Sequence, residues 1–193
     1  MTGGRIGFIK YTNRKGREYY LHEGVTRTGK PKYYFSPRRE GILVASIPAG
    51  FEVYENPNGQ VFLRKVHPKI IEEEEVTALE KEFKKSSRYK DCRVDVKKNA
   101  IIVYMPNQNV ELLAGIMSLT PRQEIEARNY LKRMLSYSPG CRFLLLDREQ
   151  RIFVAEKYYY GKTADYWMQI GQPGSLSDLV RPVIKHLDEV FFL

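Results

Sequence analysis

The sequence predicts an α+β protein, with a small antiparallel β module in residues 1–66 followed by an α+β domain in residues 67–193. Short aromatic segments of period two, separated by glycine turns, fill the first third of the chain. After residue 67, segments with helical periodicity of apolar residues alternate with segments of strand periodicity, which is typical of an α+β domain. The formal charge of +9 is also uneven, because residues 1–66 hold twelve Lys and Arg against five Asp and Glu, a net +7.

The first module is predicted to contain five strands, which span residues 8–12, 17–22, 32–36, 51–55 and 60–65. The segment Asn13 to Gly16 ends in a glycine that suits a left-handed turn position, and Gly24 and Gly29 lie in a longer connection. Residues 56–59 read Asn-Pro-Asn-Gly, a strong hairpin turn, because proline presets one dihedral angle and Asn-Gly accepts a positive φ.

The second domain is predicted to contain about three helices that pack on one face of an antiparallel sheet. The first helix follows Ile71, with four glutamates at its start and two lysines at its end, as the helix dipole favours. A second begins at Thr120, which is followed by proline and, three residues after the cap, by glutamine. A third covers residues 177–187, and Pro182 is expected to kink or restart it. Residues 92–96 and 100–105 are expected to form one hairpin, and residues 141–146 and 152–159 a second. A strand or loop at 166–167 is expected to follow.

Strand alternation divides the first sheet into two faces. The inward face is predicted to hold Ile9, Tyr11, Tyr19, Leu21, Tyr33 and Phe35, and the outward face Phe8, Lys10, Thr12, Tyr20, His22, Lys32 and Tyr34. Lysines beside aromatic rings suit nucleic acid, because cations neutralise phosphate and rings stack on bases. With the basic turns added, the predicted nucleic-acid contacts are Lys10, Arg14, Lys15, Arg17, Tyr20, Arg27, Lys30, Lys32 and Tyr34.

Two resemblances concern this first module. The stretch from Tyr11 to Phe35, and on from Ile47 to Arg64, resembles the opening of a family of uncharacterised bacterial proteins, which implies a bacterial chain but no activity. The basic strands with glycine turns also resemble the three-stranded sheets with which integrase arm-binding domains read DNA.

Two segments of the chain resemble motifs of enzymes. Residues 24–30 follow the phosphate-binding loop pattern, but Pro31 stands where that loop needs Ser or Thr and the start of a helix. Residues 143–157 resemble the core of restriction-type nucleases, in which an Asp and a Glu-x-Lys hold a metal. Here Glu156 and Lys157 are adjacent, so they point to opposite faces of a strand. We therefore expect no catalytic residue, metal or cofactor; the alternative is a divergent nuclease with Asp147 and Glu156 at a metal.

The sequence thus predicts a non-catalytic protein that binds DNA or RNA through its basic first module. The alternative is a protein-interaction or regulatory module, and residues 67–193 are a candidate surface for a protein partner or a homodimer. Cys92 and Cys141 are expected to be buried thiols, as in a reducing cytoplasm. No apolar run approaches the length of a membrane span, so a cytoplasmic protein without membrane attachment is expected.

Overall fold

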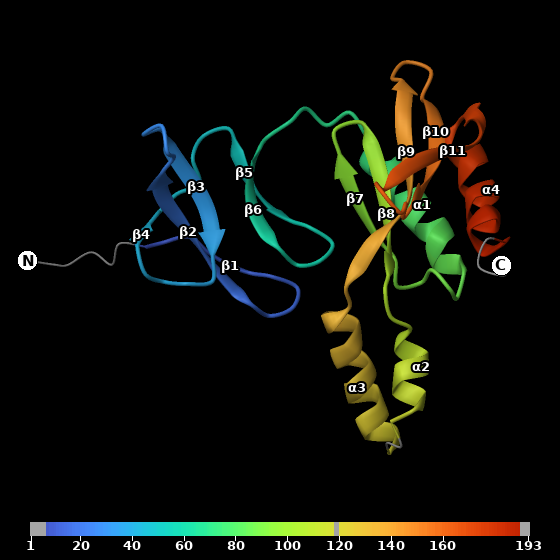
Figure 1. Ribbon diagram of the computed structural model, residues 1–193, viewed down its shortest axis with the longest axis horizontal. Helices are drawn as coiled ribbons and strands as arrows, with labels where there is room; N and C mark the ends of the chain where they lie inside the picture. Colours follow the sequence, from blue (N-terminus) through green and yellow to red (C-terminus); the bar gives the residue numbers. More distant parts are fainter. Residues whose placement is uncertain (1–6, 118–119, 190–193) are drawn as a thin grey trace, which may run out of the picture. The chain divides into compact units, whose positions relative to one another are not determined.

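The computed structural model, which describes residues 7–117 and 120–189, confirms the α+β class (Figure 1). These residues form eleven strands, all in antiparallel sheets, and four helices. The chain divides into two compact units, residues 1–67 and 68–193, one residue later than the predicted boundary.

The first unit contains two antiparallel sheets. The larger consists of β1 (Lys10–Thr12), β2 (Glu18–Val25), β3 (Pro31–Ser36) and the short β4 (Ile42–Leu43), which the sequence analysis missed. Strand β2 is central, and β3 pairs along one of its edges. Along the other edge, β1 pairs with residues 18–20 of β2 and β4 pairs with residues 22–23. The second sheet is the predicted hairpin of β5 (Phe51–Glu55) and β6 (Val61–Lys65).

Three hairpin turns of the first unit have the same construction. Asn13, Thr26 and Asn56 each open a turn that ends three residues later in a glycine with φ of +79°, +76° and +78° respectively. The side-chain oxygen of the opening residue accepts backbone amides of the turn, for example those of Lys15 and Arg17 at Asn13. Glycine adopts this left-handed conformation without steric cost, so the Asn-x-x-Gly and Thr-x-x-Gly spacings specify the turns.

The second unit is built on a five-stranded antiparallel sheet in the order β11-β10-β9-β8-β7. Its strands are β7 (Arg93–Lys97), β8 (Ala100–Pro106), β9 (Tyr137–Asp147), β10 (Ile152–Tyr159) and β11 (Tyr166–Gly174). Helices α1 (Glu73–Lys85) and α4 (Leu176–Glu189) cover one face of this sheet (Figure 1). The fully buried side chains of Phe83, Phe143 and Phe153 lie in the resulting core.

Helix α4 continues through Pro182 as one helix, so it does not restart there. Proline removes a backbone hydrogen bond from a helix interior and usually interrupts it. Here the buried residues Leu179, Val183 and Leu187 recur every four positions on both sides of the proline. The face that packs on the core is therefore continuous, and this packing holds the two halves of the helix together.

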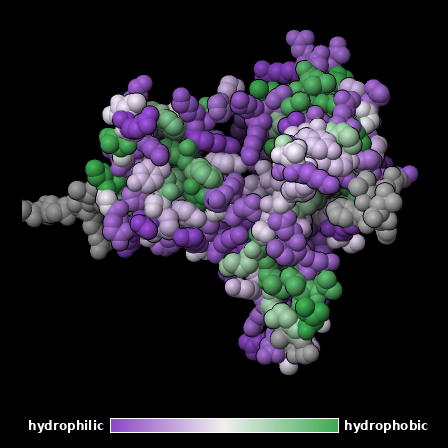
Figure 2. Space-filling view, viewed as in Figure 1, coloured by the Kyte–Doolittle hydropathy of each residue, from purple (hydrophilic) through white to green (hydrophobic). Residues whose placement is uncertain are grey.

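The connection from β8 to β9 forms a helical arm of α2 (Val110–Gly115) and α3 (Pro121–Met134), which lies apart from α1 and α4 (Figure 1). The predicted start of α3 is confirmed, since Thr120 and Gln123 form a capping box. The six-residue α2, capped by Asn109, was not predicted because it is too short for a helical period to stand out. Figure 2 shows apolar side chains gathered on the arm, and those most exposed are Leu112, Ile116, Met117, Ile125, Tyr130 and Met134.

Both cysteines are buried and unpaired, as predicted. Burial raises the pKa of Cys92 to about 11 and raises that of Cys141, which is fully enclosed, further still. Neither thiol is therefore ionised near neutral pH. Among the described helices, none is long and apolar enough to cross a membrane.

Candidate nucleic-acid interface

The outward face of the first sheet is covered at its centre, contrary to the prediction. Tyr20 and His22 are only 4% and 2% exposed, so the expectation that they lie on an open face is wrong. Residues 37–41, which lead into β4, cross this face. The Arg39 guanidinium lies 4.9 Å from the centre of the Tyr20 ring, and the carbonyl oxygen of Arg38 lies 2.9 Å from His22 Nε2. Alternation grouped these residues on one face, but could not show that a loop returns over it.

Two aromatic rings of this face, those of Phe8 and Tyr34, remain partly open to solvent. Tyr34 is 42% exposed, and its ring stacks on that of His22 at 5.3 Å with an interplanar angle of 13°. Gly24 of β2 lies beside the same ring, since a Cβ at that position would be in van der Waals contact with it at 3.4 Å. Lys32, two residues earlier on β3, places its ammonium 5.6 Å from the ring centre. The buried imidazole thus holds an exposed tyrosine beside a cation.

Exposed cations continue from this ring along β3 and its adjoining loops. Arg27 and Lys30 belong to the turn between β2 and β3, and Arg39 follows β3. Like Lys32, none of the three forms an ion pair within the described part of the chain, although Arg39 also stacks on Phe8. We call the set Arg27, Lys30, Lys32, Tyr34 and Arg39 the outer strip. The sequence analysis did not select Arg39, although the pair Arg38-Arg39 directly follows the aromatic strand.

Lys10, also predicted to bind phosphate, is engaged by an acidic residue. Its ammonium lies 2.6 Å from Glu18 Oε1 across the β1–β2 pair, and Tyr20 donates its hydroxyl to the other oxygen of Glu18 at 2.7 Å. The hydrogen bond with Glu18 raises the pKa of Lys10, and the same bond lowers the pKa of Glu18. The positive charge of Lys10 is therefore balanced locally.

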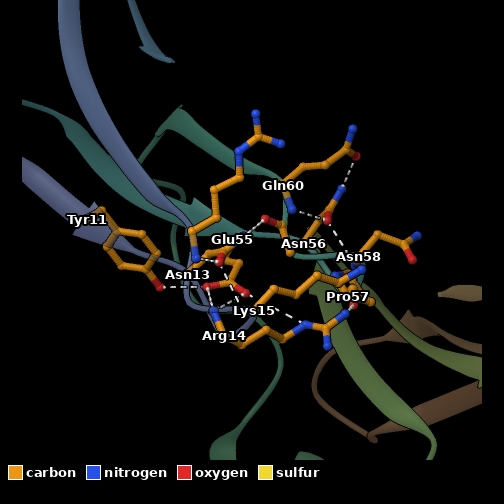
Figure 3. A network of polar contacts seen from close by, with 11 residues as sticks. Tyr11, Asn13, Arg14, Lys15, Glu55, Asn56, Pro57, Asn58 and Gln60 are labelled. Carbon is orange, nitrogen blue, oxygen red and sulfur yellow. Dashed lines mark hydrogen bonds and ion pairs between the residues drawn. The ribbon is translucent and has the colours of Figure 1, made fainter. Parts of the chain in front are cut away.

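Arg14 is the clearest departure from the predicted interface (Figure 3). Its side chain is only 15% exposed, and its Nε lies 3.7 Å from Oε1 of Glu55, which is itself only 13% exposed. The Arg14 guanidinium also donates to the carbonyl of Pro57, and the Tyr11 hydroxyl donates to Glu55 at 3.0 Å. These contacts join the β1–β2 turn to the β5–β6 hairpin. Arg14 is thus a structural residue of the first unit.

The remaining predicted cations lie outside the outer strip. Lys15 packs its aliphatic stem against Gly59, and burial, together with the charge of Arg14, lowers its pKa. Arg17 is exposed and lies 5.7 Å from the ring centre of Tyr19, which faces the opposite side of β2 from Tyr20. Of the nine predicted contact residues, the outer strip therefore retains Arg27, Lys30, Lys32 and Tyr34.

The two carboxylates of the nuclease alternative do not meet. In the β9–β10 ladder Asp147 pairs with Ile152, four residues or about 13 Å along the strand from Glu156. Asp147 accepts the amides of Glu149 and Gln150 at 2.8 and 2.9 Å, and Glu156 forms an ion pair with Arg142. Each carboxylate thus has a local structural partner. Within the described ranges, no group of three or more His, Cys, Asp and Glu side chains is arranged to hold a metal ion.

Comparisons with protein families, with curated proteins and with solved structures each found no match for this chain.

Proposed function

We propose that the first unit binds nucleic acid, with a preference for single strands, through the outer strip. The observation that carries this proposal is that four exposed cations, which form no ion pair among the described residues, accompany one exposed tyrosine whose ring stacks on the buried His22. Phosphates would contact Arg27, Lys30, Lys32 and Arg39, and an unpaired base would stack on Tyr34.

The charge distribution supports a phosphate-binding role. Arg14 and Lys10 are balanced by Glu55 and Glu18, whereas the cations of the outer strip form no ion pair among the described residues. Binding to phosphate releases condensed counterions from the nucleic acid, which favours association at low salt. A planar ring beside such cations accepts any base, because every base presents a π face.

Fluorescence anisotropy of the full chain with matched single-stranded and double-stranded oligonucleotides tests the proposal. We expect binding that weakens steeply as salt rises and that is tighter for the single strand, whose bases are free to stack. The absence of binding at low salt would refute the proposal. Oligonucleotide binding that does not change with salt would contradict phosphate contacts as its basis.

We infer a second function, self-association, for the helical arm of the second unit. Helix α3 has no fully buried residue, and Ile125 and Tyr130 remain 62% and 54% exposed. Apolar side chains gathered on a projecting element are typical of protein contacts. Light scattering should give the mass of a dimer for the full chain and of a monomer for Ile125→Glu. A monomeric parent chain would refute this inference.

A further inference from the structure

The second unit contains a pocket of about 1020 Å³. Its walls come from the connection between α1 and β7, from the end of β8 and the start of α2, and from neighbouring ends of β9 and β10, with Leu187 of α4. Apolar and aromatic walls include Tyr89, Met105 and Tyr159, while Asn107 and Ser138 add polar groups. This combination of apolar lining and few polar groups is typical of small-molecule sites.

One lysine in the lining is buried without an anionic partner among the described residues. Lys157 of β10 is only 8% exposed, and no ion pair or hydrogen bond of its side chain is found in the described residues. Its ammonium lies 5.1 Å from the centre of the Tyr159 ring. The residue opposite on β9 is Cys141, whose thiol is neutral because burial raises its pKa.

The acidic residues of the pocket are already occupied. Asp91 lies 3.6 Å from the ammonium of Lys132, and Glu111 binds Lys90 at 2.9 Å and Arg128 at 3.2 Å. Neither carboxylate is left to balance Lys157. Burial consequently lowers the pKa of Lys157, because the charged amine loses water without gaining a counterion.

Burying a cation that has no carboxylate partner among the described residues costs free energy. A hydrocarbon side chain of similar length would fill the same space at no such cost. An anion that binds from solution would form an ion pair with the Lys157 ammonium, which would explain why a lysine occupies the wall of a pocket.

We propose that this pocket binds a small organic anion, whose carboxylate, sulfonate or phosphate group pairs with Lys157 while an apolar or aromatic body lies against Tyr89, Met105 and Tyr159. The site belongs entirely to the second unit, so it is independent of nucleic-acid binding by the first. The expected ligand carries one negative charge at the end of a flat or apolar body.

Anilinonaphthalene sulfonate, a fluorescent aromatic anion, is a suitable probe for the full chain. We expect the dye to bind the folded protein and Lys157→Met to weaken binding about tenfold or more, as the loss of one charge-assisted contact implies. Lys162→Met is the matched control, because Lys162 is exposed near the end of the same strand and does not line the pocket. That variant should bind the dye like the parent protein.

A melting curve without dye separates a ligand-binding lysine from a structural one. If Lys157 serves a ligand, Lys157→Met should melt at the same temperature as the parent protein or higher. Three results would overturn the proposal: no dye binding to the folded parent, equal binding to Lys157→Met and the parent, or a Lys157→Met variant that melts several degrees lower or fails to fold. Dye bound to the helical arm would give the second of these results.

Discussion

The two units are stabilised in different ways. The second has a large apolar core in which several aromatic and aliphatic side chains, among them Phe143, Phe153 and Ile101, are fully buried. The first has few buried apolar residues, chiefly Tyr20, Leu21 and Val61, and relies on strand ladders, glycine turns and the contacts of Arg14 with Glu55 and Pro57. A small sheet with little core uses some of its charges for structure.

This difference shows that basic residues close in sequence have unlike roles. Arg14 and Arg27 both lie in hairpin turns that end in glycine, yet Arg14 faces Glu55 whereas Arg27 faces solvent. Net charge alone therefore overstates the surface available to phosphate. A cation that pairs with an acidic residue from a distant segment is not available to contact phosphate.

The largest expected effect concerns the core of the second unit. Phe143→Ala should lower its free energy of unfolding by about 3 to 5 kcal/mol, because it leaves a cavity in a fully packed core. Trp167, the only tryptophan, lies in β11 and reports this unit in a urea titration followed by fluorescence. Oligonucleotide binding should persist under mild conditions. Its loss would show that the two units do not act separately.

Arg14→Ala should destabilise the first unit by about 2 to 3 kcal/mol, because it leaves the mostly buried Glu55 without its cation. Far-UV circular dichroism should show the first unit melting earlier, while the Trp167 transition stays in place. Arg17→Ala is the control, since Arg17 is exposed and forms no ion pair among the described residues. If Arg14→Ala left stability unchanged but reduced nucleic-acid binding, Arg14 would belong to the nucleic-acid interface after all.

Tyr34→Ala should weaken binding to a single strand by about 1 to 3 kcal/mol and binding to a duplex much less, because duplex bases are already stacked. Its effect on the salt dependence should be small, since no charge is removed. Tyr34→Phe keeps the ring and should bind like the parent protein in anisotropy titrations. Equal losses on both nucleic acids would argue against stacking.

Periodicity and turn chemistry were sufficient for most of the fold, because the elements concerned carry local signals. The Asn-x-x-Gly spacing at Asn13 and Asn56 specifies the turns, and Thr120 with Pro121 specifies the start of α3. The missed elements, β4 and α2, have two and six residues and are too short to show a period. The separation of Asp147 from Glu156 was not predicted, because the sequence argument rested on the adjacency of Glu156 and Lys157, which places them on opposite faces of a strand.

The candidate sites were less accessible to sequence reasoning, because they depend on contacts between distant segments. The pairing of Arg14 with Glu55 spans 41 residues, and nothing local to Arg14 indicates it. Tyr20 is buried because Arg39 folds back over it. Likewise, the acids that line the pocket of Lys157 are paired with Lys132 and Lys90, which come from other segments. In each case a partner remote in sequence determines the role of the residue.

A smaller effect tests the nuclease alternative. Asp147→Ala should cost about 1 kcal/mol in stability, because the amides of Glu149 and Gln150 lose their acceptor in an exposed turn. Incubation of the parent protein with labelled DNA and Mg²⁺ should leave the DNA intact. Cleavage that disappears in both Asp147→Ala and Glu156→Ala would contradict the structural role assigned to these carboxylates.

The central claim is that the unpaired cations of the outer strip contact phosphate while Arg14 holds the fold. Its most direct test is the slope of log affinity against log salt for a labelled single strand, measured for the parent chain and for the triple variant Arg27→Ser, Lys30→Ser, Lys32→Ser. Each phosphate contact on a single strand contributes about 0.7 to this slope, so the triple variant should lose about 2 units while keeping its melting temperature. An unchanged slope in a folded triple variant would contradict the claim.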